Sequence, residues 1–113
     1  MNISITRESS IAIAAISGDV THATAPEFQQ CLLDELTRSK NLVLDFSELN
    51  LLTSSGLRGL LLLHRAAADG DCRLVLAAVP DAVRDVMEIT GFWDQFGHYP
   101  SLAEARAALV ESA

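Results

Sequence analysis

A run of small hydroxyl residues, Thr53-Ser54-Ser55, stands with Gly56 directly before a leucine-rich segment that the sequence predicts to be a helix over 55–69. Hydroxyl side chains suit a helix N-terminus, where backbone N–H groups lack intrahelical partners and the positive end of the dipole faces outwards. A phosphate group would be stabilised electrostatically at such a place. For any one of these serines, plain helix capping is the commoner explanation. The junction is therefore a candidate phosphorylation site whose meaning depends on the rest of the chain.

The predicted helix has one charged side and one apolar side when it is wound at about 3.6 residues per turn. The charged side is expected to meet solvent and carries Ser55, Arg58, Leu62, Arg65 and Asp69. The apolar side is expected to meet the core and carries Leu57, Leu60, Leu63, His64 and Ala67. Leu62, placed between two arginines, forms a small apolar patch with a polar rim, which is typical of a surface that docks another protein.

Two residues of this segment have more ordinary interpretations. His64 falls on the core side, so we expect a histidine packed at the edge of the core rather than a catalytic one. Gly59 costs the helix about 1 kcal/mol relative to alanine, which indicates either close approach by a neighbouring segment or simple tolerance.

Apolar patterning predicts the strands. Isoleucine alternates with polar residues at 3–5 and again at 11–13, which predicts a hairpin of two half-exposed strands. The nearly continuous apolar run Leu42–Phe46 predicts a strand covered on both faces near the centre of a sheet, with Asp45 at its carboxyl end. A second buried strand is expected over Leu74–Val79.

Capping patterns predict where the remaining helices begin. The segment Thr24–Glu27 has threonine and glutamate at the spacing of a capping box, and so does Ser101–Glu104. A third helix opens at 80–81, ends at Gly91, and is expected to turn to the core a side that carries Val83, Val86, Met87 and Thr90. Strands alternating with helices favour a single α/β domain over residues 1–113, with helices laid on a mixed sheet.

The composition limits the kinds of partner. A formal charge of −7, from 15 acidic and 8 basic side chains, disfavours direct binding to nucleic acid or to anionic membrane surfaces. The chain shows no secretory signal and no apolar run near the roughly 20 residues of a membrane span. Cys31 and Cys72 form no CxxC pair and the histidines are scattered, so we expect a reduced, cytoplasmic protein with no metal site and no cofactor.

Several short segments, taken in their order and spacing, resemble the STAS domain, and specifically the bacterial anti-sigma factor antagonists. The resemblance covers nearly the whole chain and implies the STAS fold, with a mixed sheet of about four to five strands covered by about four α-helices. It is carried by Gly18-Asp19-Val20, Leu42 to Ser47, Ser54 to Leu57, Leu74 to Pro80, Ile89 to Phe92 and Ser101 to Ala105.

The resemblance implies a partner-switching regulator with no catalysis of its own, phosphorylated on Ser55 by an anti-sigma factor that is an ATP-using serine kinase. The unphosphorylated form binds this kinase and frees the sigma factor, the phosphorylated form lets go, and a serine phosphatase resets the cycle. Together with the helix face, this implies a monomer or weak dimer whose partner-binding residues are Thr53, Ser54, Ser55, Gly56, Arg58, Leu62 and Arg65. Thr53 and Thr21 stand where many members carry aspartate, which puts full kinase recognition in question.

Two alternative functions remain open from the sequence. A STAS subunit of a lipid-transport ABC system would dock on its ATPase without a phosphorylation switch, although such subunits tend to carry threonine and alanine at the paired-serine positions. An enzyme would use Ser55 as nucleophile with His64 and Asp45. The junction is not a G-x-S-x-G elbow, and His64 points away from Ser55 on the helical wheel. Motifs of nucleotide-binding loops are also missing from the sequence.

Overall fold

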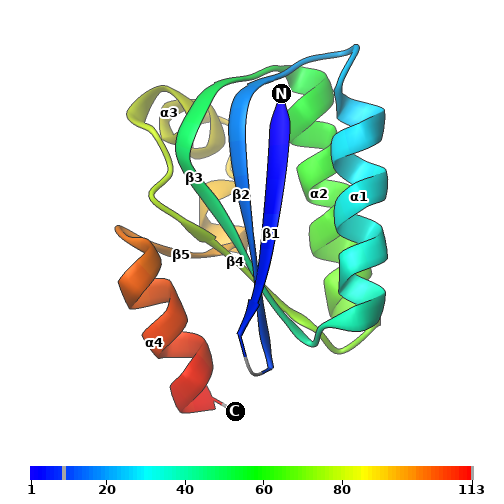
Figure 1. The fold of residues 1–113 in the computed structure, drawn as a ribbon. Helices are drawn as coiled ribbons and strands as arrows, with labels where there is room; N and C mark the ends of the chain where they lie inside the picture. The colour runs from blue at the N-terminus through cyan, green and yellow to red at the C-terminus, as the bar shows by residue number, and fades with distance from the viewer. Residues whose placement is uncertain (9, 113) are drawn as a thin grey trace.

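A five-stranded sheet in the order β1-β2-β3-β4-β5 forms the centre of the fold in the computed structural model, which describes residues 1–8 and 10–112, with side chains to residue 110 (Figure 1). Strand β1 is antiparallel to β2, and the other neighbouring strands are parallel. The strands are β1 (Asn2–Glu8), β2 (Ile11–Val20), β3 (Asn41–Leu52), β4 (Arg73–Ala77) and β5 (Gly97–Tyr99). The helices are α1 (Ala25–Arg38), α2 (Ser54–Asp69), α3 (Asp81–Ile89), the short 3-10 turn η1 (Trp93–Gln95) and α4 (Leu102–Ser112). The predicted mixed α/β architecture is confirmed.

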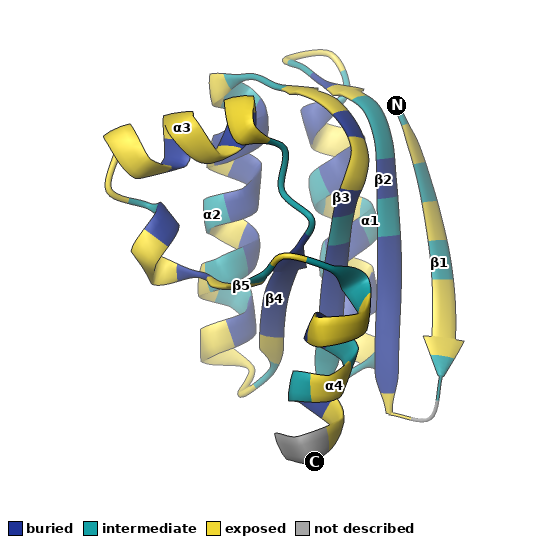
Figure 2. Ribbon diagram, turned by 90° about the vertical axis from the view of Figure 1, so that its left-hand side faces the viewer, coloured by how far each residue is buried: buried dark blue, intermediate teal, exposed yellow. Residues whose placement is uncertain are grey.

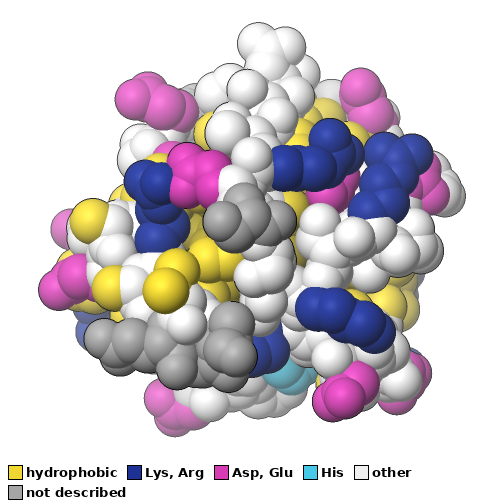
Figure 3. All heavy atoms as spheres, turned by 60° about the horizontal axis from the view of Figure 1, so that its bottom comes forward, with side chains coloured by type: hydrophobic (Ala, Val, Ile, Leu, Met, Phe, Trp, Pro, Cys, Tyr) yellow, Lys and Arg dark blue, Asp and Glu magenta, His cyan; other side chains and the backbone are white. Residues whose placement is uncertain are grey.

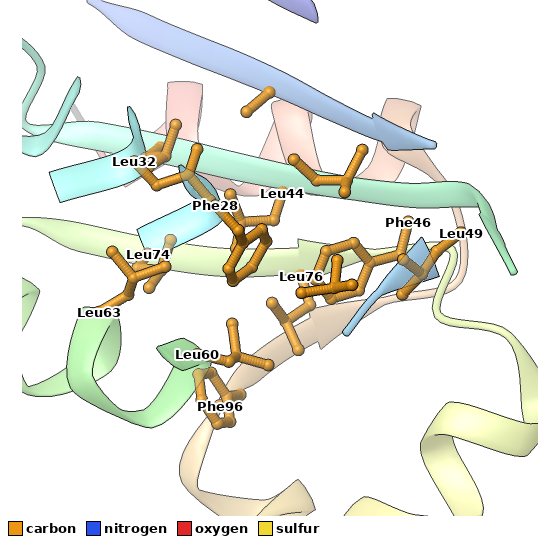
Figure 4. Packing of buried hydrophobic residues seen from close by; sticks show 14 of the residues in the cluster. Phe28, Leu32, Leu44, Phe46, Leu49, Leu60, Leu63, Leu74, Leu76 and Phe96 are labelled. Atoms are coloured by element: carbon orange, nitrogen blue, oxygen red, sulfur yellow. The ribbon is translucent and has the colours of Figure 1, made fainter. Parts of the chain in front are cut away.

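Helices cover both faces of the sheet unequally. Helices α1 and α2 lie side by side on one face, and the larger core fills the space between them and the sheet, as the labelled residues from Phe28 to Phe96 show (Figure 4). Helix α4 covers part of the other face, where Ala105 and Leu109 pack on Ile13, Val43 and Val75. None of the helices described is long and apolar enough to cross a membrane.

Two of the predicted strands differ from their expected form. Strand β2 is buried from Ile11 to Ala14 rather than half-exposed, because it pairs with β1 on one side and β3 on the other and is covered on both faces. Strand β3 continues to Leu52, so Asp45 lies in its middle and not at its carboxyl end. The pairing of β2 with β3 shifts register between Ala15 and Ser17 and then continues to Val20 and Leu52, so β3 extends beyond the apolar run Leu42–Phe46.

The expected cap of α1 is wrong. The Thr24 hydroxyl accepts from the Thr21 N–H at 2.8 Å and donates to the Asp19 carbonyl at 3.0 Å, so it closes the preceding turn instead of capping the helix. The cap of α4 is confirmed in its main part, because Ser101 Oγ accepts from the Glu104 N–H at 3.2 Å.

Helix α3 turns fewer residues to the core than predicted. Val83 and Met87 are buried, whereas Val86 is 46% exposed and Thr90 is also exposed. Figure 2 shows why: the helix lies near the end of the sheet, and most of its surface faces solvent. Gly91 has a φ of +80°, the left-handed conformation expected of a glycine that ends a helix.

A buried carboxylate ties β1 to α1. Glu35 is 1% exposed, and its two oxygens accept from Arg7 Nε at 3.0 Å and from an Arg7 terminal nitrogen at 2.7 Å. Ser39 Oγ donates to the same carboxylate at 3.0 Å. The hydrogen bonds from Arg7 lower the pKa of Glu35 against the opposing effect of burial, and Ser39 adds to the lowering.

The end of the molecule that carries the β1–β2 connection has basic, acidic, hydrophobic and uncharged groups on its surface (Figure 3). On that face the described Lys and Arg side chains stand apart, separated by acidic and uncharged groups, and form no continuous basic surface. The net charge of the chain is −7. This face is therefore poorly suited to tracking a phosphate backbone.

Glu35→Gln should lower the free energy of unfolding by about 1–3 kcal/mol at neutral pH, because a hydrogen bond to a charged partner inside the protein is lost. A lowered carboxyl pKa contributes stability that is complete above its ordinary value of 4.5 and is lost as the pH falls through the lowered value. Urea unfolding from pH 7 to pH 3 should therefore show a steeper acid loss for the native chain than for Glu35→Gln. The exposed pair Arg84–Glu88 supplies the control: Glu88→Gln should change stability by less than about 0.5 kcal/mol. If the native chain and Glu35→Gln lost the same free energy of unfolding as the pH falls, this role of Glu35 would be contradicted.

Candidate functional site

The hydroxyl junction lies where β3 passes into α2, at the end of the sheet where β2 also ends (Figure 1). One acceptor fixes it there: the carbonyl oxygen of Val20 accepts the backbone N–H of Thr53 at 3.0 Å and its hydroxyl at 3.2 Å. The Thr53 carbonyl in turn accepts the Leu57 N–H at 2.9 Å, the first turn of the helix. The start of α2 is thus tied to the last residue of a neighbouring strand.

The two serines differ in exposure. Ser54 is exposed, and Ser55 and Thr53 are half-buried. No described side chain caps the N-terminus of α2, and its first turn carries no acidic residue. The positive end of the helix dipole therefore meets an incoming anion without a competing carboxylate on the same turn. Arg58, one turn on, is exposed and supplies a positive charge.

Gly56 has a packing role. A Cβ at this position would lie 2.6 Å from Leu52 Cδ1, 2.9 Å from Val20 Cγ1 and 3.1 Å from the Val20 carbonyl oxygen. Gly56 is buried, so it does not form part of the exposed surface that was expected to touch a partner. Its missing side chain lets α2 begin in contact with β2.

The two predicted sides of α2 are confirmed. Arg58, Arg65 and Asp69 are exposed and Leu62 is 38% exposed, while the opposite side is buried at Leu57, Leu60, Leu63 and Ala67. We call the exposed set Arg58, Leu62 and Arg65 the α2 stripe. Figure 2 shows the same alternation of exposed and buried turns along α2. Exposed apolar surface flanked by two arginines is present, as the helical pattern indicated.

His64 and Gly59 take the ordinary roles considered for them. His64 is half-buried, and its ring centroid lies 4.7 Å from that of Phe96, at the edge of the core. A Cβ on Gly59 would lie 3.7 Å from Phe28, an ordinary contact, so no neighbouring segment requires a glycine there.

Sequence patterns missed two features beside the junction. Leu51, an apolar residue two positions before Thr53, is 45% exposed. Asn50 Nδ2 donates to Asp19 Oδ1 at 2.8 Å and so joins the ends of β3 and β2 at the surface. Only the long-range pairing of the two strands brings these residues together, and no local signal predicts that pairing. Thr21 accepts the Ala23 N–H at 3.2 Å within the adjoining turn.

The residues of the enzymatic alternative are not assembled. Asp45 lines a hollow with Ser17 and Ser47 on the sheet face that α4 partly covers, and its Oδ1 accepts the Ser47 N–H at 3.0 Å. His64 lines a different hollow with Ala67 and Gly97, beside α2 on the opposite face. No cluster of three or more potential metal ligands occurs within the part of the chain that the structure describes.

Comparison with known proteins gives one consistent result. The sequence model of the STAS domain matches residues 2–105. BtrV of Bordetella bronchiseptica, provisionally named an anti-sigma factor antagonist, is 30% identical over 109 residues, which cover 96% of this chain and 94% of BtrV. An anti-sigma factor antagonist from Mycobacterium paratuberculosis shares the fold with a TM-score of 0.85 at 24% identity, over 95% of this chain and 92% of that one. Unphosphorylated SpoIIAA of Bacillus aligns with a TM-score of 0.82 at 15% identity, over 97% of both chains.

Gly56→Ala should destabilise the chain by about 1–3 kcal/mol, because the added methyl group meets Leu52 and Val20 at less than contact distance. Gly59→Ala in the same helix is the matched control and should stabilise the chain by up to about 1 kcal/mol, since the methyl finds space and the helix gains propensity. Chemical unfolding followed by circular dichroism measures both. Equal effects of the two substitutions would show that the close approach at Gly56 does not set the start of the helix.

Proposed function

The chain belongs to the STAS domain family, and we propose that it is an anti-sigma factor antagonist that is switched by phosphorylation of its serine junction. One observation carries the proposal: an exposed serine stands at the uncapped N-terminus of α2, next to the α2 stripe. The name of BtrV, at 30% identity over nearly the whole chain, supports the same function. A lipid-transport subunit has no comparable support.

Exposure favours Ser54 over Ser55 as the acceptor. Sequence analysis assigned the phosphate to Ser55, which is half-buried, whereas Ser54 is exposed at the first position of α2. Phosphoryl transfer needs the acceptor oxygen to meet the γ-phosphorus of ATP roughly in line with the leaving group, so the more exposed residue is the better substrate. We therefore propose Ser54 as the principal acceptor and keep Ser55 as the second candidate.

Phosphorylation at either serine changes the charge of the surface and leaves the domain folded. The phosphate adds close to two negative charges beside the α2 stripe, where the helix N-terminus and Arg58 can hold it. The junction keeps its place because the Val20 carbonyl binds Thr53, which is not modified. A partner that presents acidic groups to the stripe would have to bury this anion without supplying a cation of its own, which costs more than a modest interface supplies.

The proposed cycle involves two partners in the cytoplasm. A kinase-type anti-sigma factor, which carries the ATP, binds the unmodified junction and the α2 stripe and then phosphorylates the serine. A serine phosphatase restores the hydroxyl. Because Arg58 and Arg65 flank Leu62, the kinase surface should present acidic groups around an apolar centre.

Ser54→Ala should abolish most phosphate incorporation by a kinase-type anti-sigma factor, while Ser55→Ala should keep it and both variants should still bind the kinase. The reason is the difference in exposure between Ser54 and Ser55. Phosphopeptide mapping by mass spectrometry after incubation with kinase and ATP gives the site directly. Phosphate on Ser55 alone would reverse the assignment within the junction, and phosphate on neither serine would contradict the proposed switch.

Leu62→Arg should weaken kinase binding at least about tenfold with little change in thermal midpoint, because Leu62 is an exposed apolar centre of the stripe. Val110→Arg is the matched control: Val110 is 62% exposed on α4, on the far side of the sheet, and the substitution should leave binding unchanged. Isothermal titration calorimetry measures both. Equal binding by the two variants would remove α2 from the interface, and a large loss of stability in Leu62→Arg would show that the residue packs inside.

A further inference from the structure

The chain changes sides at one point of the sheet. After β2, β3 and β4 it crosses over through α1, α2 and α3, whose buried hydrophobic side chains all belong to the larger core. After β5 it enters α4, whose buried residues Ala105 and Leu109 pack on the opposite face. The carboxyl ends of the parallel neighbours β4 and β5 therefore lead to helices on opposite faces. The segments that leave these two strand ends thus run to opposite faces and leave a crevice between them, and ligands of open α/β sheets bind in crevices outside the carboxyl ends of the strands.

A cavity of about 300 Å³ occupies this crevice, and its walls include Val79, Arg84, Trp93, His98, Tyr99 and Pro100. This volume is at the lower end of the range of small-molecule sites, which suits a compact ligand. The lining residues come from the segment after β4, from α3, from η1 and from β5 with the residue after it; Figure 2 shows how these elements are arranged. Ala78 also lines the cavity, with a φ of +54°, a conformation that residues other than glycine seldom adopt and that is often held at ligand sites.

The walls of this cavity combine flat apolar surface with positive charge. The Arg84 guanidinium lies 4.9 Å from the Trp93 ring centroid, and the His98 ring stacks on the same indole at 3.9 Å. Tyr99, Val79 and Pro100 add apolar surface. Arg84, His98 and Tyr99 supply hydrogen-bond donors, and no carboxylate belongs to the described lining. Such walls suit a small ring that carries an anionic group.

An adjoining cavity determines where the anionic group of a ligand can lie. It has a volume of about 450 Å³, shares Arg84, Trp93 and His98 with the first, and adds the carboxylates of Glu88 and Asp94. Glu88 accepts from Arg84 Nε at 2.6 Å, and Asp81 and Asp85 also act electrostatically on the Arg84 guanidinium. Among the described residues, the terminal nitrogens of Arg84 make no hydrogen bond, so they can receive another anion. Because the second cavity repels negative charge, an anionic group is favoured in the first cavity only.

We propose that the crevice between the carboxyl ends of β4 and β5 is a binding site for a small aromatic carboxylate, with the ring against Val79, Tyr99 and Pro100 and the carboxylate on Arg84 and His98. Arg84 is the charge that selects the anion, and its fork of donors matches a carboxylate. The site is separate from the serine junction, so it stands without the switch proposed above.

Benzoate serves as the probe, because Trp93 is the only tryptophan of the chain and lines the cavity. Its indole fluorescence and its indole N–H signal in NMR should shift saturably with benzoate, with a dissociation constant of about 0.1–1 mM. Acetate, which has the charge without the ring, and benzamidine, which has the ring with the opposite charge, should give no saturable shift. Saturable shifts with either control, or none with benzoate, would overturn the site.

Two substitutions locate the binding on Arg84. Arg84→Gln should weaken benzoate binding at least about tenfold, and Arg84→Lys should fall between, since it keeps the charge and loses the fork. Arg65→Gln on α2 is the matched control and should bind like the native chain. Because Arg84 is exposed, thermal melts of all variants should agree within a few degrees. Unchanged benzoate affinity in a folded Arg84→Gln variant would contradict the proposal.

Discussion

The carbonyl oxygen of Val20 determines where α2 begins. It takes two hydrogen bonds from Thr53, one from the backbone and one from the hydroxyl, and Gly56 lets the helix come close enough for both. A residue with a side chain at position 56 would push the first turn away from β2. The exposed serine, the free helix N-terminus and the direction of the α2 stripe all follow from this attachment. The sheet holds the Val20 carbonyl in place, because Val20 ends a strand that is paired on both sides.

A switch needs a site that changes charge while the fold stays fixed. The hydroxyls stand outside the core, and the residues that hold the junction are Val20, Thr53 and Gly56, none of which is proposed to carry phosphate. The stability of the domain rests elsewhere, on the core between the sheet and α1–α2 and on the Glu35 carboxylate that ties β1 to α1. The junction and the interactions that stabilise the interior are thereby separated, which is what the proposed switch requires.

Periodicity predicted the helices well, since α2 buries Leu57, Leu60 and Leu63 as its 3.6-residue pattern requires. Features that depend on pairing between distant strands could not be predicted this way. The burial of β2, the extension of β3 to Leu52 and the Asp19–Asn50 contact arise from the pairing of strands that are distant in the sequence, which local patterns do not contain. The threonine at position 24 had the right spacing for a cap, but a turn that uses Thr21 and Asp19 took its hydroxyl. The difference in exposure between Ser54 and Ser55 likewise depends on how the first turn of α2 packs on Val20 and Leu52.

The proposed release of the partner on phosphorylation can be measured as the affinity of the unmodified and the phosphorylated chain for a kinase-type anti-sigma factor. Native protein and protein phosphorylated at the junction should be titrated against the same kinase by calorimetry, with their thermal midpoints recorded in parallel. Phosphorylation should weaken binding at least about tenfold, or about 1.4 kcal/mol, while the thermal midpoint stays within a few degrees. Equal affinity of the two forms, or a loss of affinity that comes with loss of the fold, would contradict it.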